Sequence, residues 1–328
     1  MATIEPIFGA RAPVTLQTHI LDEERRFPES GGTLSWIFSA LAIAAKTISA
    51  KLKCAGLDDI LGDVGTENVQ GERQQKLDVI ANEVLIQVLR GRDGVAVIGS
   101  EEDEELIFVE RRDGSDRAGY AVMFDPLDGS SNLDVCGGVG TIFSIFACGE
   151  DGALRPGRDQ IAAGYVLYGP STVFVTTTGN GVHMFVLDTS VGAFIRVAEF
   201  LRIPETGKVY SVNEANLDGF PEGYRRFLAQ CRDRGYSSRY AGAMVADVHR
   251  VLLKGGIFMY PPTAKAPDGK LRLMYEANPM AFIVEQAGGA ASTGRGDILD
   301  VLPEALHQRV PVIIGSQHEV EALVDALR

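Results

Sequence analysis

One acidic string near the middle of the chain constrains its fold and its chemistry more than any other segment. The string Asp-Pro-Leu-Asp-Gly-Ser-Ser-Asn spans residues 125–132 and directly follows the apolar run 120–124, which is typical of a buried strand. Pro126 and Gly129 predict a turn at the end of that strand, across the two carboxylates. Carboxylates beside a Gly-Ser-Ser turn suit a divalent cation that holds a phosphate group.

A second acidic cluster also follows a predicted strand. Residues 100–105 read Ser-Glu-Glu-Asp-Glu-Glu and come directly after the apolar run 95–98. Glu276 is a more distant acid at the start of a predicted helix. Each acidic segment alone is typical of a solvated turn or an exposed face. Together, acids at two strand ends indicate a shared metal site.

The predicted ligands are all hard oxygen donors, and no His or Cys accompanies them. This set favours Mg²⁺ or Mn²⁺ over zinc. Two such ions, about 3.5–4 Å apart, stabilise the attacking and leaving oxygens of an in-line displacement. The candidate donors are Glu101, Glu102, Asp125, the Leu127 carbonyl, Asp128 and Glu276.

Several cationic and aromatic residues are candidates for holding a sugar phosphate. Lys270 and Arg272 alternate on one face of a predicted strand, and Tyr240 and Tyr260 can donate phenol hydroxyls. The alternative is that the tyrosines pack in the core and the cations lie on an exposed strand. The amides of the turn that begins at Gly129 are further candidates, since they can receive phosphate oxygens.

Composition excludes some partners. The formal net charge of −13 disfavours nucleic acid and anionic membrane, so an anionic substrate needs local cations. The four cysteines show no C-x-x-C spacing, which argues against a zinc ribbon or a redox pair and favours a cytoplasmic protein. We see no signal peptide, and the apolar stretch 36–45 is too short to span a bilayer.

The sequence texture divides the chain into three parts. Residues 1–29 carry little pattern and predict a loosely ordered arm, and residues 55–75 predict a long polar loop. Residues 30–205 predict two amphipathic helices, at 34–52 and 77–88, and a mostly antiparallel sheet. Residues 206–328 alternate helix and strand, which indicates an α/β half. The predicted strands are 95–98, 106–109, 120–124, 141–147, 161–168, 172–177, 209–212, 257–260 and 312–315, and the later helices are 224–232, 244–253, 278–286 and one at the C-terminus.

The string at 125–132 resembles the D-P-L-D-G-S-S-N element of class I fructose-1,6-bisphosphatases, within the magnesium-dependent, lithium-sensitive sugar and inositol phosphatase superfamily. The resemblance covers roughly residues 30–328. It implies a layered α-β-α-β-α fold with mixed sheets in two halves, and a homotetramer. The other similar segments are 76–79, 100–103, 139–143, 240, 244–250, 255–260, 270–272 and 275–280.

The resemblance also implies a role for each site residue. Asp78 and Glu102 would orient and deprotonate the attacking water, and Lys270 and Arg272 would lie near the sugar. The implied ligands of two or more Mg²⁺ ions are Glu101, Asp125, Leu127, Asp128 and Glu276. The implied contacts of the 1-phosphate are Asp128, Gly129, Ser130 and Ser131. Those of the 6-phosphate are Asn213, Tyr240, Tyr260 and Lys270, with Arg239 from a neighbouring subunit.

The implied activity is hydrolysis of fructose 1,6-bisphosphate to fructose 6-phosphate and phosphate, in gluconeogenesis or a Calvin-type pathway. A sedoheptulose 1,7-bisphosphatase, or an enzyme with both activities, is the nearest alternative. A catalytically dead sugar-phosphate sensor is a third hypothesis from another class. The intact set of acids counts against that sensor, because a protein without activity does not need every ligand.

One departure from the family concerns regulation by nucleotides. Regulated members carry a Lys-Tyr pair before the strand that leads into the acidic string, and an Arg after the next strand. This chain has Gly119-Tyr120 and Ala147 at those positions. We therefore expect a vestigial regulatory pocket and weak or absent inhibition by AMP.

Overall fold

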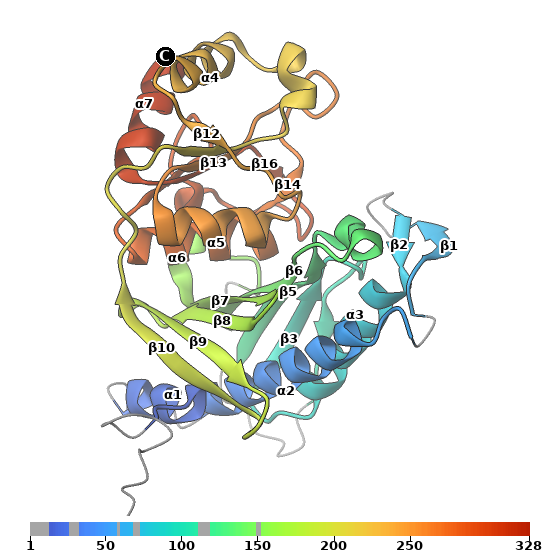
Figure 1. The fold of residues 1–328 in the computed structure, drawn as a ribbon. Helices are drawn as coiled ribbons and strands as arrows, with labels where there is room; N and C mark the ends of the chain where they lie inside the picture. Colours follow the sequence, from blue (N-terminus) through green and yellow to red (C-terminus); the bar gives the residue numbers. More distant parts are fainter. Residues whose placement is uncertain (1–12, 26–32, 58–59, 68–72, 111–118, 149–151) are drawn as a thin grey trace, which may run out of the picture.

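The computed structural model describes residues 13–25, 33–57, 60–67, 73–110, 119–148 and 152–328. They form two halves, one above the other in Figure 1. Helical and sheet layers alternate through both halves and enclose separate hydrophobic cores between them. The predicted fold class, layered α-β-α-β-α with mixed sheets in two halves, is confirmed.

A large sheet forms the N-terminal half. Its strands are β3 (Val95–Ser100), β4 (Ile107–Phe108), β5 (Tyr120–Asp128), β6 (Val139–Ala147), β7 (Gln160–Tyr168), β8 (Thr172–Thr177), β9 (Val182–Asp188) and β10 (Ala193–Leu201). They are ordered β10-β9-β8-β7-β6-β5-β3-β4. Of these pairs β3 and β5 run parallel and the rest antiparallel, so the predicted mostly antiparallel sheet is confirmed. The sequence missed β9 and β10.

Both faces of the central strands β5, β6 and β7 are buried, whereas the edge strand β10 is partly exposed. Three helices cover one face: α1 (Leu16–Glu24), α2 (Thr33–Lys53) and α3 (Lys76–Arg90). Phe143 points into that core, while its neighbour Ile142 points into the core on the opposite face. A strand covered on both sides carries apolar residues on both faces, which is why 139–147 is apolar except at Gly140, Thr141 and Ser144.

Helix α2 is long and apolar enough to cross a membrane by length and composition, but 56% of its most apolar window is buried inside the molecule. It packs against α1, α3 and the large sheet, as the core helix of a folded domain does. We therefore assign it to the core of the N-terminal half.

Two expectations about the N-terminal half were wrong. Within the predicted loose arm, residues 1–12 and 26–29 lie outside the described residues, but the part between them contains the ordered helix α1. Thr15 caps this helix, and Leu16 and Ile20 are fully buried. The segment predicted as a polar loop contains a short hairpin, β1 (Asp63–Glu67) and β2 (Arg73–Gln75). Both segments lack a strong apolar period, so neither α1 nor the hairpin could be predicted from periodicity.

A second sheet forms the centre of the C-terminal half. Its order is β12-β11-β13-β17-β15. Helices α5 and α6 lie between it and the large sheet, and α4 and α7 cover its outer face (Figure 1). The predicted boundary near residue 205 falls between the two sheets. The bounds are β11 (Val209–Ser211), α4 (Glu222–Asp233), β12 (Ser237–Ser238), α5 (Met244–Lys254), β13 (Ile257–Tyr260), α6 (Asn278–Gln286), β15 (Ala290–Ser292), β17 (Val312–Gly315), α7 (Gln317–Leu327), and the small pair β14 (Leu271–Arg272) and β16 (Arg309–Val310).

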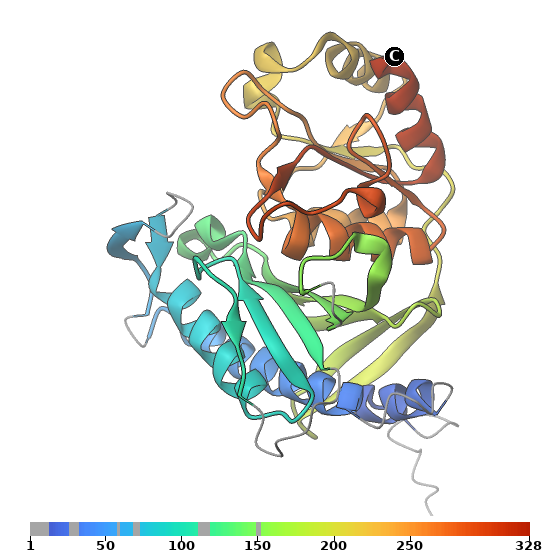
Figure 2. The ribbon, with the colours of Figure 1, turned by 180° about the vertical axis from the view of Figure 1, so that it is seen from behind.

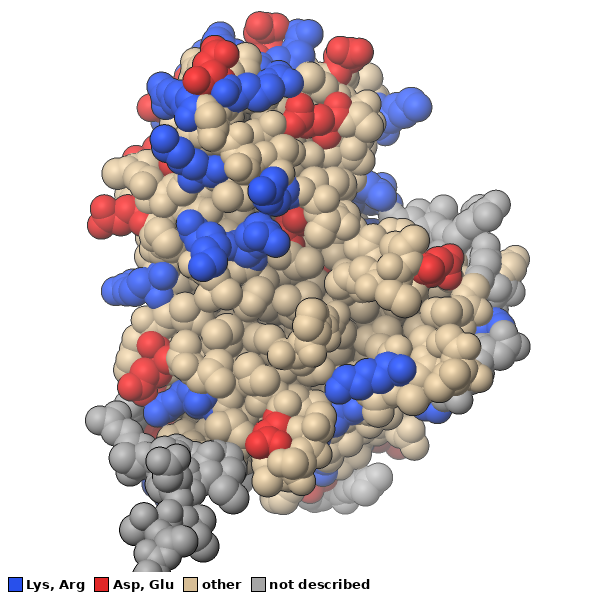
Figure 3. All heavy atoms as spheres, viewed as in Figure 1, with Lys and Arg blue, Asp and Glu red and all other residues tan. Residues whose placement is uncertain are grey.

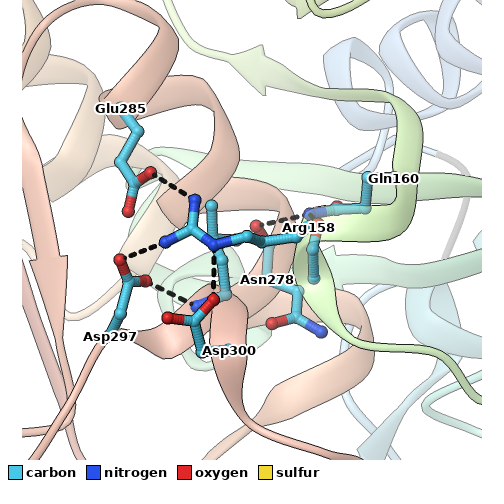
Figure 4. Close-up of polar contacts among 8 residues, drawn as sticks. Arg158, Gln160, Asn278, Glu285, Asp297 and Asp300 are labelled. Carbon is cyan, nitrogen blue, oxygen red and sulfur yellow. Dashed lines mark hydrogen bonds and ion pairs between the residues drawn. The ribbon is translucent and has the colours of Figure 1, made fainter.

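Arg158 links the two halves by ion pairs. It lies in the short helix η3 (Gly157–Asp159), which packs against α6 in Figure 2. Its guanidinium pairs with Asp300, with Asp297 at 2.5 Å and with Glu285 at 3.5 Å, all in the C-terminal half (Figure 4). Gln160 Nε2 adds a bond to the carbonyl oxygen of Asn278, at 3.1 Å. One cation therefore neutralises several acids across the join.

We expect Arg158→Ala to lower the free energy of unfolding by about 1 kcal/mol, the upper range for a partly exposed ion pair. The change leaves three carboxylates close together without their shared cation. Urea unfolding checks this. The matched control is Arg155→Ala, because Arg155 pairs with Asp159 within the same half. Equal losses in the two variants would contradict a special role for Arg158 at the join.

Candidate active site

A cavity of about 740 Å³ opens between the two halves. Its walls contain residues of both halves. Arg239 does not line it: this exposed side chain donates a hydrogen bond to the Ser238 carbonyl, at 2.8 Å. The other predicted site residues all do, namely Asp78, Glu101, Glu102, Asp125, Leu127, Asp128, Gly129, Ser130, Ser131, Asn213, Tyr240, Tyr260, Lys270, Arg272 and Glu276.

The end of β5 positions the first two acids. The sequence predicted a turn across Asp125 and Asp128, and this is wrong: β5 continues through Asp128 and the turn comes at Gly129. The register with β6 slips between the two acids, so the strand bulges there. Proline is tolerated at a bulge because its missing N–H breaks no ladder bond, which accounts for Pro126.

Acids from distant parts of the chain meet at this strand end. Carboxylate oxygens of Asp125, Asp128 and Glu276 all lie within 4.8 Å of one another, and all three side chains are buried. Glu276 lies in a π-helical turn, η5 (Leu273–Ala277), directly before α6, rather than in the first turn of a regular helix. Both halves therefore contribute to one acidic cluster.

The parallel pairing of β3 with β5 brings in Glu101. Ser100 is the register partner of Phe124, and the Glu101 amide donates to the Phe124 carbonyl at 3.1 Å. The next residue on each strand is therefore an acid of the cluster. Arg272 Nη2 lies 2.9 Å from Glu101 Oε1, and its Nη1 lies 3.7 Å from Glu276 Oε2. This buried guanidinium partly balances the cluster.

The cluster is costly to charge. Burial raises the pKa of Glu101 to about 8, against the opposing effect of Arg272. Burial likewise raises the pKa of Asp128 to about 7, although the Val245 amide opposes it. The pKa of Asp125 is raised by burial and by the Glu101 charge. A hard cation among these oxygens would remove that cost, so the donor set fits a divalent metal.

Asp78 and Glu102 lie at the edge of the cavity next to β2. Asp78 is buried in the first turn of α3 and accepts the Gln75 amide at 2.8 Å, which fixes its carboxylate. Glu102 accepts Gln74 Nε2 at 2.6 Å. Both acids are thus oriented by neighbours from the short hairpin segment.

The Gly-Ser-Ser turn lies against the C-terminal half. It leads into the 3-10 helix η2 (Ser130–Val135), and Gly129 adopts φ 78°. A Cβ at Gly129 would lie 2.3 Å from the Ala243 Cβ, so only glycine fits here. Asp128 accepts the amides of Met244 and Val245, at 3.2 and 2.7 Å. An acid of the cluster, from one half, is thereby held at the N-terminal end of α5 in the other half.

The residues predicted to hold the second phosphate line the same cavity from the C-terminal half, and we call them the distal group: Asn213, Tyr240, Tyr260 and Lys270. Burial and the nearby Tyr260 raise the pKa of Tyr240 to about 12, so its phenol stays protonated and can donate. Asn213 caps the short helix η4 (Glu214–Gly219) through the Ala215 amide, at 3.1 Å. Lys270 is exposed at the cavity wall. Lys and Arg gather on the C-terminal half of the face shown in Figure 3, although the chain is acidic overall.

Sequence reasoning missed several residues that shape the cavity. Gln75, Gly242, Ala243 and Met244 line it. Asp247, buried in the first turn of α5, holds the segment before that helix. The sequence placed Asp247 in a segment that resembles the family but gave it no role in the site, because an acid in a first helical turn is a common dipole partner.

Comparison with known proteins gives consistent matches over the whole site. The family model described as "Fructose-1-6-bisphosphatase, N-terminal domain" matches residues 14–199, and the one described as its C-terminal domain matches residues 203–328. Among solved structures, the Leishmania major fructose-1,6-bisphosphatase in holo form is similar, with a TM-score of 0.91 and 38% sequence identity. That match covers 96% of this chain and 99% of the other.

The raised pKa values predict that the metal-free protein loses stability as pH rises. An acid whose pKa is raised by folding contributes stability at pH values below its pKa in the unfolded chain. This contribution is lost as the pH rises through its pKa in the folded protein. In EDTA, we expect the free energy of unfolding to fall by roughly 2 kcal/mol between about pH 4.5 and 8. Urea unfolding at several pH values measures it.

Two comparisons sharpen that measurement. Added Mg²⁺ should flatten the slope, because the cation replaces the protons. Asp125→Asn should also flatten it in EDTA, because one charge is removed from the cluster. A slope in EDTA that neither change alters would contradict this origin.

Proposed function

The chain belongs to the fructose-1,6-bisphosphatase family, and from this membership we infer that it is a phosphatase that hydrolyses fructose 1,6-bisphosphate. We propose that the 1-phosphate is the one released, leaving fructose 6-phosphate. The observation that carries this proposal is the single cavity in which an acidic cluster and a Gly-Ser-Ser turn lie opposite a distal group of hydroxyl, amide and ammonium donors. Such a cavity suits a substrate with a phosphate at each end.

The acids would hold two or more Mg²⁺ ions, and Mn²⁺ suits the same ligands. The proposed ligands are Glu101, Asp125, the Leu127 carbonyl, Asp128 and Glu276. When bound, the metal supplies positive charge that polarises the 1-phosphate and lowers the pKa of a nearby water. The chain's own contribution is a fixed and largely buried set of oxygens on which that charge can be placed.

The remaining residues bind and orient the substrate. Gly129, Ser130 and Ser131 would receive the 1-phosphate through amides and hydroxyls. Glu102 and Asp78, held by Gln74 and by the Gln75 amide, would orient the attacking water and take its proton.

At the far end, the distal group would hold the 6-phosphate, and Arg272 would lie near the sugar. This distal group consists of Asn213, Tyr240, Tyr260 and Lys270. Holding both ends of the substrate keeps the 1-phosphate aligned with the water.

Assembly and location are proposals of the same kind. We propose a cytoplasmic homotetramer that serves gluconeogenesis or a Calvin-type pathway. Arg239 is exposed and faces away from its own cavity, which suits a residue that completes the distal group of a neighbouring subunit. Sedimentation of the wild type tests the assembly. The KM of an Arg239→Ala variant for the bisphosphate tests whether Arg239 completes the distal group of a neighbouring subunit.

We expect Asp125→Asn to lower kcat by roughly 100-fold or more, because the cluster loses a charge that a divalent metal needs. The circular dichroism spectrum should stay unchanged, since the replacement has the same shape. The assay is phosphate release from fructose 1,6-bisphosphate with and without Mg²⁺. Asp93→Asn changes an exposed acid in the turn before β3, at the opposite end of that strand from Glu101. It is the matched control and should match the wild type. Full activity in Asp125→Asn would rule out the metal role.

We also expect AMP to inhibit weakly or not at all. The two positions that lack cations are Gly119 and Ala147. Tyr120 pairs with Ala147 across β5 and β6, and the Cys148 amide donates to the Gly119 carbonyl at 2.7 Å, so these two positions lie close together on the sheet. A nucleotide phosphate bound there would lack its positive partners. Titration of AMP against bisphosphate hydrolysis tests this, and inhibition at micromolar AMP would show the expectation to be wrong.

A further inference from the structure

The two phosphate-binding groups of the proposed function come from different halves. The Gly129–Ser131 turn lies in the N-terminal half, and Tyr240 begins the segment 240–243 of the C-terminal half. For a bisphosphate, the separation of these two groups decides which substrate length fits. Any contact that holds the segment 240–243 against the turn therefore bears on substrate choice.

The peptide of Ala241 is held from both sides. Its N–H donates to the two carboxylate oxygens of Asp247, at 2.9 and 3.1 Å. Its carbonyl accepts a hydrogen bond from Asn132 Nδ2, at 3.0 Å, and the same nitrogen donates to the Gly138 carbonyl at 3.2 Å. Asn132 lies in η2, directly after the phosphate-binding turn. The bridge thus joins the two phosphate groups by one side chain and one peptide.

The segment around Ala241 depends on this bridge more than the turn does. Gly242 adopts φ 79°, and because it has no side chain it adds no packing contact that would hold the segment in place. The turn has further support, because Asp128 accepts two amides of α5 and Gly129 packs on Ala243. Loss of the bridge should therefore displace Tyr240 and leave the turn in place.

We propose that Asn132 and Asp247 are positioning residues that set the separation of the two phosphate-binding groups by holding the Ala241 peptide. This separation selects hexulose bisphosphates over sugar phosphates that have no second phosphate or that carry it further from the first. This inference rests on the proposed function and explains which distance between the two phosphates of the substrate the site accepts. Neither residue touches the reacting atoms, so both act through Tyr240.

The test uses two competitive inhibitors of bisphosphate hydrolysis, each with one phosphate. Fructose 6-phosphate probes the distal group, and fructose 1-phosphate probes the turn. Asn132→Leu removes the donor to the Ala241 carbonyl without adding a charge beside the phosphate-binding turn. We expect it to raise the inhibition constant of fructose 6-phosphate, and the KM of the bisphosphate, about tenfold. The constant for fructose 1-phosphate should change less than about twofold.

Asp247→Ala removes both acceptors of the Ala241 N–H and so provides an independent break in the same bridge, from the opposite side. It should weaken fructose 6-phosphate selectively, as the Asn132 variant does. Because both residues hold one peptide, the double variant should be no worse than the worse single variant. If one single variant fails to fold, as judged by its melting temperature, the other single variant still provides the test.

Two results would overturn the inference: equal weakening of both inhibitors, or independent effects that multiply in the double variant. The first would indicate a defect in the turn itself, and the second would mean that no shared peptide is held. Asp134→Asn, an exposed acid in the same short helix, is the matched control and should change neither constant. A wild type that releases no phosphate from the bisphosphate would instead refute the proposed function.

Discussion

The burial of like charges at one strand end is the constraint on which the rest of the structure depends. Four carboxylates crowd together there, with Arg272 beside them as a buried cation. Charges at such separations repel by several kcal/mol even when partly screened, roughly 4 kcal/mol per pair at 4 Å. The fold accepts this cost because cations can take the place of protons. The same acidic cluster therefore lowers the stability of the metal-free fold and provides the oxygens that could bind a metal.

The acids stay together because both halves hold them. Parallel pairing aligns Glu101 with Asp125, while a π-helical turn of the other half brings in Glu276. Asp128 accepts two amides at the N-terminal end of α5, where a negative charge is favourable. The geometry of the acidic cluster therefore depends on the contact between the halves, and the ion pairs of Arg158 stabilise that contact.

The sequence predicted what lies close together along the chain. Strands buried on both faces appear as apolar runs, and the acids, the Gly-Ser-Ser turn and the distal tyrosines could all be named from it. Helix α1 was missed because it is short and weakly amphipathic. The bulge in β5 was missed because Asp-Pro and Asp-Gly are also ordinary turn formers. The sequence placed Asn132 and Asp247 in segments that resemble the family, but it did not predict what they contact. The bond from Asn132 to Ala241 joins residues 109 positions apart, and no local pattern encodes it.

The distance between the two phosphates that the proposed site accepts therefore depends on the contact between the halves and not on either half alone. An enzyme that removes a single phosphate needs the acidic cluster and the turn, which lie mostly on β3, β5 and η2. Recognition of a second phosphate requires the segment 240–243 to stay at a fixed distance from that turn. Hydrogen bonds across the contact fix such a distance better than apolar packing, because their strength falls steeply with distance and angle. The polar bridge through Ala241 is the kind of contact that this requirement favours.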